Sequence, residues 1–119
     1  MTVIELEAYR RVVRARRLGD IAPAVADILH VLVESGGALH RREVAQRLAE
    51  RRGIFSREGR DAVEAEVFGA FDRYMQFAAG KRQAPLMHLP FGPGSYRWAV
   101  TEAGRRLLAQ AGERRAARS

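Results

Sequence analysis

The chain contains no cysteine, which excludes a disulfide framework, a thiolate zinc site and a cysteine nucleophile. No apolar run approaches the length of a membrane span, and the N-terminus lacks the apolar core of a signal peptide, so we expect a soluble, cytoplasmic protein with no membrane partner. The three histidines fall on three different expected elements, and P-loop, dinucleotide, G-x-S-x-G and HExxH motifs do not occur. The sequence therefore predicts no catalysis, no cofactor and no metal site.

Lysine is almost missing as well, because Lys81 is the only lysine among 21 basic residues. The 14 acidic residues leave a formal charge of +7 on 119 residues, a length that suits one domain with one core. A strongly basic balance favours polyanionic partners, with nucleic acid first and an anionic membrane surface second. An arginine skew also arises in GC-rich genomes without any role in binding, so the charge alone leaves both explanations open.

What the sequence does contain is a clear hairpin signal at residues 84–101. Tyr96, Trp98 and Val100 alternate with other residue types, which is typical of a strand with one buried face, and a Gly-Pro-Gly turn precedes them. We expect these three side chains to lie on the inner face of the hairpin. Thr101 is placed to cap a closing helix at residues 102–111.

The same segment carries a resemblance at Tyr96, Thr101, Gly104, Arg105 and Leu108. Y-R-W-A-V-T-E-A-G-R-R-L-L resembles the wing strand and closing helix of winged-helix regulators of the PadR and MarR families, and of the N-terminal domain of Mrr-type restriction proteins. The resemblance implies a winged helix-turn-helix fold, mainly α with one β-hairpin (α+β). It also implies a homodimeric protein that binds double-stranded DNA and regulates transcription.

Helical periodicity and stop signals divide the rest of the chain. His40 is a possible cap of the third helix, Ser56 can cap the fourth, and Ile54 and Phe55 are expected to anchor the turn between them at residues 54–61. The expected single domain, 1–119, has a helix at 2–18, a helical core with the helix-turn-helix at 21–80, the wing hairpin at 84–101, the closing helix at 102–111 and a disordered basic tail at 112–119.

The fourth helix, expected at residues 61–79, is the candidate recognition helix. Arg73 and Gln76 face outward and are suited to the edges of guanine and adenine. Flanking cations are expected to contact phosphates: Arg42, Arg47, Lys81, Arg82 and Arg97. The helix is also acidic, which opposes entry into a groove lined with phosphates. A winged-helix module that binds another protein instead of DNA therefore remains the alternative.

Two apolar sets are candidates for dimer contacts. Leu6, Tyr9 and Val13 form a stripe on the first helix, which either packs on its own domain or serves as a dimerisation arm. Phe68 and Met75 form a shoulder beside the outward face of the fourth helix, and they meet either another element of the same chain or a partner.

Overall fold

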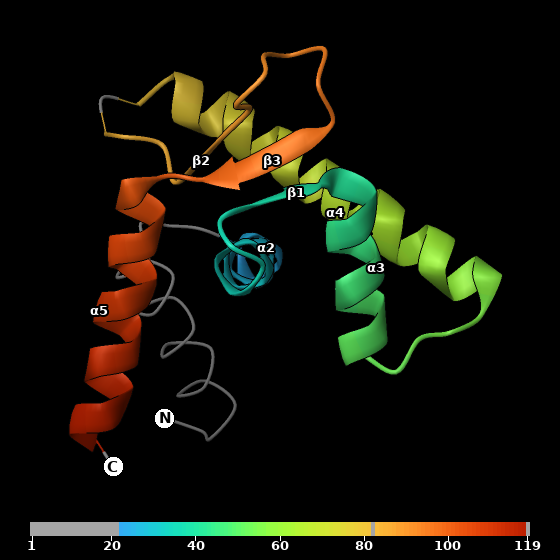
Figure 1. Ribbon diagram of the computed structural model, residues 1–119, viewed down its shortest axis with the longest axis horizontal. Coiled ribbons are helices and arrows are strands. Elements are labelled where there is room, and N and C mark those ends of the chain that lie inside the picture. The colour runs from blue at the N-terminus through green and yellow to red at the C-terminus, as the bar shows by residue number, and fades with distance from the viewer. Residues whose placement is uncertain (1–21, 82, 119) are drawn as a thin grey trace, which may run out of the picture.

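The computed structural model describes residues 22–81 and 83–118, with side chains of the last helix described as far as Ala111 (Figure 1). The described chain is mainly helical with one small antiparallel sheet, as an α+β reading predicts. Its elements are α2 (Pro23–Glu34), β1 (Ala38–His40), α3 (Arg41–Arg51), α4 (Arg57–Ala79), β2 (Met87–His88), β3 (Arg97–Val100) and α5 (Glu102–Arg118). The helix expected at 2–18 lies outside the described residues.

The sheet has the order β1–β3–β2, so β3 is paired on both edges. Leu39 lies opposite Trp98 in β1–β3, and Met87 lies opposite Val100 in β2–β3. The prediction of a purely helical core at 21–80 is wrong at β1. A strand of three residues is too short to show alternation, and it exists because β3 supplies its hydrogen bonds. Gly37, at φ +107°, turns the chain from α2 into it.

The core lies where α2 meets the other helices and the sheet, and Figure 1 shows α2 end-on at that centre. Ile28, Leu29 and Leu32 of α2 are fully buried. Trp98 is 3% exposed, and its ring stacks on Phe71 of α4 at 3.9 Å between centroids. The predicted burial of Trp98 is confirmed, and aromatic stacking of this kind is worth about 0.5–1.5 kcal/mol beyond the area that it buries.

Tyr96 is a correction to the predicted hairpin, because its side chain is 54% exposed and the residue precedes β3. Strict alternation also fails at Ala99, which is buried although it was expected to face outward. The two departures have separate causes. Tyr96 lies before the strand and its ring packs on the Arg41 guanidinium, whereas Ala99 is buried on the face of β3 opposite to Trp98, so both faces of the strand are covered at this point.

Side-chain caps set the starts of three helices. His40 accepts from the backbone N–H of Arg42, and Ser56 accepts from that of Gly59, which confirms both predicted caps. Thr101 accepts from Gly104 N–H in the same way. Capping is encoded within four residues, so the sequence alone can reveal it.

The turn between α3 and α4 is shorter than predicted, because α4 begins at Arg57 and not at residue 61. Residues 52–56 make the connection. Ile54 packs against the core as expected, but Phe55 is 68% exposed, so the prediction that it anchors the turn is wrong. The early start places Arg57 and Arg60 on the first turns of the helix.

The closing helix is longer than predicted, because α5 continues to Arg118 through the expected stop at Gly112 and the expected disordered tail. A glycine inside a helix costs only about 1 kcal/mol relative to alanine, and the flanking alanine, glutamate and arginine residues are good helix formers. Near its start, Gly104 is buried and lies close to the Leu86 carbonyl.

Candidate nucleic-acid interface

The outward face of α4 carries the two residues expected to read bases. Arg73 and Gln76 are both exposed, as the helical period predicts. Arg73 lies two turns beyond Glu66 on the same side of the helix, and its guanidinium folds over Gly69. The absence of a side chain at Gly69 therefore leaves room for this arginine.

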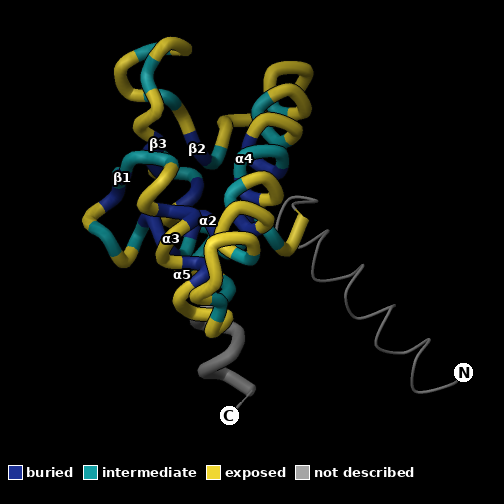
Figure 2. The backbone as a smooth tube through the Cα atoms, turned by 90° about the vertical axis from the view of Figure 1, so that its right-hand side faces the viewer, coloured by how far each residue is buried: buried dark blue, intermediate teal, exposed yellow. Residues whose placement is uncertain are grey.

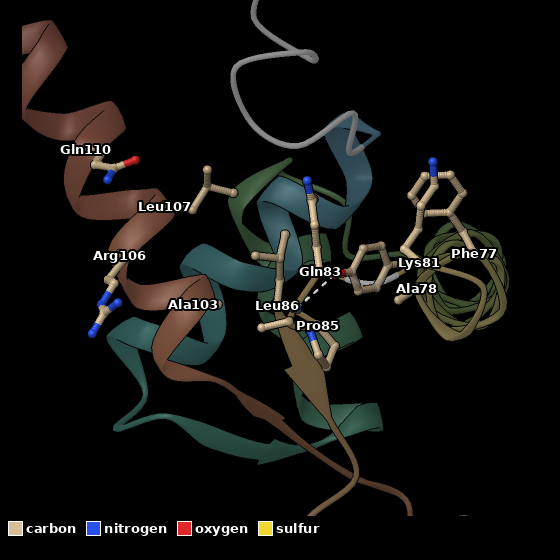
Figure 3. A pocket seen from close by; sticks show the side chains of 12 residues that line it. Phe77, Ala78, Lys81, Gln83, Pro85, Leu86, Ala103, Arg106, Leu107 and Gln110 are labelled. Atoms are coloured by element: carbon tan, nitrogen blue, oxygen red, sulfur yellow. Dashed lines mark hydrogen bonds between the residues drawn. The ribbon is translucent and has the colours of Figure 1, made fainter.

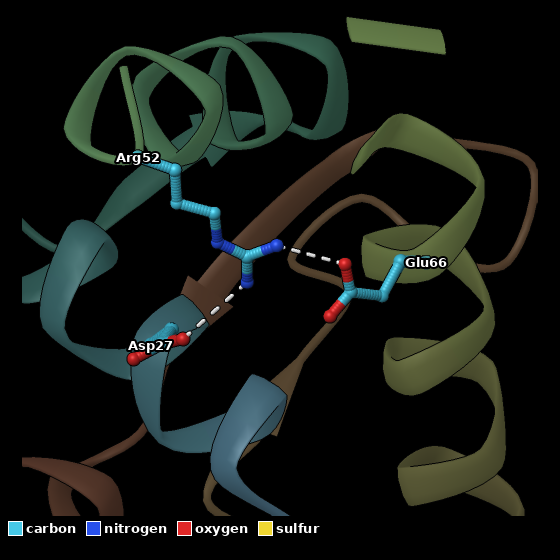
Figure 4. Close-up of polar contacts among 3 residues, drawn as sticks. All are labelled: Asp27, Arg52 and Glu66. Atoms are coloured by element: carbon cyan, nitrogen blue, oxygen red, sulfur yellow. Dashed lines mark hydrogen bonds and ion pairs between the residues drawn. The ribbon is translucent and has the colours of Figure 1, made fainter. Parts of the chain in front are cut away.

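Arg52, just after α3, joins three helices through two carboxylates (Figure 4). Its guanidinium donates to Glu66 of α4 at 2.8 Å and lies 3.6 Å from Asp27 of α2. The hydrogen bond with Glu66 is the largest of the effects that raise the pKa of Arg52, and burial opposes it. One acidic side chain of α4 is thus neutralised within the protein, which reduces the repulsion that this helix would exert on phosphates.

Charge is divided unevenly along α4 and the segment after it. Residues 58–72 contain one cation, Arg60, and these acids: Glu58, Asp61, Glu64, Glu66 and Asp72. Residues 73–101 contain no acid and four cations: Arg73, Lys81, Arg82 and Arg97. The electrostatic conditions for binding a polyanion are therefore better at the C-terminal end of α4 and along the hairpin than on the first half of α4.

The residues expected to contact phosphates are dispersed. Arg42 and Arg97 are exposed, and Arg97 lies opposite His40, the residue that precedes α3. Lys81 is exposed and its ammonium lies 4.7 Å from the centre of the Phe77 ring. Arg47 donates to Ser35 Oγ at the end of α2, at 2.8 Å, so part of its donor capacity is already used. Arg82 lies outside the described residues.

Arg41 is a residue of this surface that sequence reasoning missed. Its guanidinium carbon lies 4.4 Å from the ring centre of Phe68 and 4.0 Å from that of Tyr96, so the cation is held between two aromatic faces. The Arg41 backbone N–H also donates to the Tyr96 carbonyl at 2.8 Å. The buried Nε has no hydrogen-bond partner among the described residues. Phe68 and Tyr96 are distant from Arg41 in the sequence, so no local pattern predicts this contact.

The two rings that flank Arg41 belong to a longer series of aromatic contacts that reaches into the core. Phe68 meets the Trp98 ring edge to face at 5.8 Å, and Trp98 stacks on Phe71. At the outer end, His40 meets Tyr96 at 6.1 Å. This series fixes the base of the hairpin to α4. Phe68 and Met75 are both partly buried and pack against the core of their own chain. Their role as dimer contacts stays a prediction.

The loop between β2 and β3, residues 89–96, is called the hairpin loop below. Figure 2 shows it projecting from the body with mostly exposed residues. Phe91 is 74% exposed at its tip. Two backbone hydrogen bonds, Gly92 N–H to Leu89 O and Ser95 N–H to Gly92 O, each 3.1 Å long, order the loop. In both views the loop and the C-terminal end of α4 lie at the same end of the molecule (Figures 1 and 2).

No protein-family model, curated protein or solved structure matches this chain.

A cavity of about 400 Å³ lies between the C-terminal end of α4, the segment before β2 and α5 (Figure 3). Phe77, Leu86 and Leu107 line it, with Lys81 and Arg106 at its edge. Tyr74, also in the wall, accepts a hydrogen bond from Leu86 N–H at 2.8 Å, and burial raises its pKa.

Within residues 22–81 and 83–118, no group of three potential metal ligands comes together. No helix in that part of the chain is long and apolar enough to cross a bilayer. The stripe formed by Leu6, Tyr9 and Val13 lies outside the described residues.

Proposed function

We propose that this protein is a winged helix-turn-helix domain that binds double-stranded DNA and acts as a transcriptional regulator. The supporting observation is the order helix, strand, helix, helix, strand, strand, helix, with the first strand paired to the last. In this assignment α3 and α4 are the helix-turn-helix, the five residues 52–56 are its turn, and the hairpin is the wing.

The charge distribution supports a nucleic-acid partner and selects the cations involved. Exposed Arg73 and Gln76 have the donor patterns for base edges, while Arg42, Lys81, Arg82 and Arg97 supply positive charge for phosphates. Arg57 and Arg60 stand at the start of α4, the part of a recognition helix that reaches bases in many helix-turn-helix proteins. They are flanked by Glu58 and Asp61, so we assign the principal contact to the C-terminal half of α4 and the wing.

The test is binding of the protein to a random-sequence duplex over a range of salt concentrations. Four phosphate contacts predict a slope of log K against log salt of about −3.6. Arg97→Ala should lower the magnitude of the slope by about one unit. Arg51→Ala is the matched control, because this exposed arginine lies at the end of α3 and pairs with Glu34 of α2. Absence of duplex binding at low salt would overturn the proposal.

The specificity of the contact tests the base-reading residues. Arg73→Ala should cost about 1–3 kcal/mol at a preferred sequence and relax the choice at one base pair. Asp72→Asn should tighten binding to all sequences, because it removes a negative charge next to Arg73. Unchanged binding in both variants would remove α4 from the interface.

A protein-binding module is the second candidate, and an exposed aromatic side chain favours it. Phe55 is largely exposed in the turn that leads into α4, and the first half of α4 is acidic. Such a surface suits a basic, apolar partner. This candidate gains support if duplex binding is absent at low salt.

A further inference from the structure

We propose that the hairpin loop acts as an apolar wedge, with Phe91 entering between adjacent base pairs of duplex DNA and unstacking them. This inference rests on the proposed DNA binding and adds to it a deformation of the bound duplex. It begins from an exposed feature that the fold does not explain: a phenylalanine ring that is 74% exposed and makes no contribution to the core.

The composition of the loop suits insertion better than electrostatic contact with a groove. Residues 89–95 carry no charge, and Pro90, Phe91 and Pro93 form its exposed tip. Loops that follow the phosphate backbone carry arginine or lysine, whereas side chains that enter a base step from the minor groove are apolar, with phenylalanine and proline among them.

The loop is also preorganised. Gly92, at φ +91°, allows the turn that brings its N–H to the Leu89 carbonyl, and Ser95 N–H closes a second turn on Gly92. At its base, Tyr96 is fixed against Arg41, which in turn contacts Phe68 of α4. A loop that separates stacked bases must keep its conformation while it does so. The contacts of Tyr96 with Arg41, and of Arg41 with Phe68, hold the base of the loop against the core.

The charges around the loop identify DNA as the occupant of this surface. No acid occurs between Asp72 and Glu102, and Arg97, Arg41 and Arg42 lie at the base of the loop. Cations at the base can hold the two phosphate strands while the uncharged tip reaches the bases between them. A basic protein partner would be repelled by the same cations.

The experiment compares two short duplexes that differ at one position. One has an intact central TpA step, and the other has that step mismatched, so that its bases are already unstacked. A wedge must separate the intact step at a cost in free energy, so the wild-type protein should bind the mismatched duplex about tenfold more tightly, equivalent to about 1.4 kcal/mol. A 2-aminopurine placed in the intact step should gain fluorescence when binding unstacks it. The TpA step is chosen because pyrimidine–purine steps unstack most easily.

The variants separate the wedge from general loss of an aromatic ring. Phe91→Ala should abolish both the preference for the mismatch and the fluorescence gain, while Phe91→Leu should keep most of both. Phe55→Ala is the matched control, since Phe55 is 68% exposed in the turn beside the acidic half of α4; it should behave as wild type. Trp98 fluorescence verifies that each variant is folded.

The outcomes distinguish this inference from the function on which it rests. Salt-dependent duplex binding with equal affinity for the two duplexes would overturn the wedge and leave DNA binding standing. A preference that survives Phe91→Ala would also overturn it. Failure to bind either duplex would overturn both proposals.

Discussion

Two glycine-to-alanine substitutions, both within helices, should change stability in opposite directions. An added Cβ at Gly104 would overlap the Leu86 carbonyl oxygen and would lie 2.7 Å from Val100 Cγ2, so the backbone at Leu86 would have to shift. At Gly69 the nearest atom is Nη1 of Arg73, at 3.0 Å, and it belongs to the far end of a flexible side chain. Both substitutions favour the helix, Gly69→Ala in the interior of α4 and Gly104→Ala in the first turn of α5, but the two sites differ in the space available.

The expected magnitudes follow from these contacts. Alanine in a helix interior is favoured over glycine by about 1 kcal/mol, so Gly69→Ala should stabilise the protein by about 0.5–1 kcal/mol. The Leu86 carbonyl that blocks Gly104 accepts from Thr101 N–H at 3.0 Å, so displacing it strains a hydrogen bond worth about 1 kcal/mol. Overpacking adds about 1–3 kcal/mol, which leaves Gly104→Ala destabilised by about 1–3 kcal/mol after the propensity gain.

Urea unfolding monitored by Trp98 measures both changes, because Trp98 is the only tryptophan of the chain and is buried at the contact between β3 and α4. Midpoints should shift in opposite directions with unchanged m-values. A Gly104→Ala protein as stable as wild type would refute the close approach of α5 to the segment before β2.

Three further results are expected. Trp98→Ala should cost about 3–5 kcal/mol, and free quenching of native Trp98 by iodide would contradict its burial. Arg52→Gln should cost only about 0.5–1 kcal/mol, because the arginine is 33% exposed and its two carboxylate partners are 48% and 49% exposed. The loss should shrink in high salt, and an equal loss at all salt concentrations would exclude an electrostatic origin. Because the pKa of Tyr74 is raised in the folded protein, its neutral phenol contributes stability below about pH 10, and this stability is lost as the pH rises through the folded-state pKa. The free energy of unfolding of Tyr74→Phe should therefore fall less steeply at alkaline pH than that of the wild type. Parallel pH profiles of the two proteins would refute this.

Sequence reasoning predicted the parts of this fold that are encoded locally. The caps at His40, Ser56 and Thr101 depend on residues within four positions, and the buried face of α4 follows from its period. It failed where a distant partner decides the structure. β1 is a strand only because β3 lies beside it, and Tyr96 leaves the inner face for a contact with Arg41.

The candidate interface shows the same division. The exposure of Arg73 and Gln76 could be predicted, because a helix places residues outward at a fixed interval. Two contacts could not be predicted, because each joins side chains from separate helical segments. Arg47 donates a hydrogen bond to Ser35, and Arg52 neutralises Glu66. Charge counted along the sequence therefore overstates both the cations that are free for a ligand and the acids that repel it.

The pairing of β1 with β3 also sets an order of events during folding. β1 ends at His40 and its only partner among the described strands begins at Arg97, so more than half of the described chain forms the closed loop between them. Closing that loop costs chain entropy before any strand contact is gained, whereas α2, α3 and α4 meet through contacts closer in sequence. We expect the three helices to form the folding nucleus and the sheet to close after the transition state. During synthesis on a ribosome, the backbone groups of β1 that pair with β3 would stay unpaired until β3 has emerged from the exit tunnel.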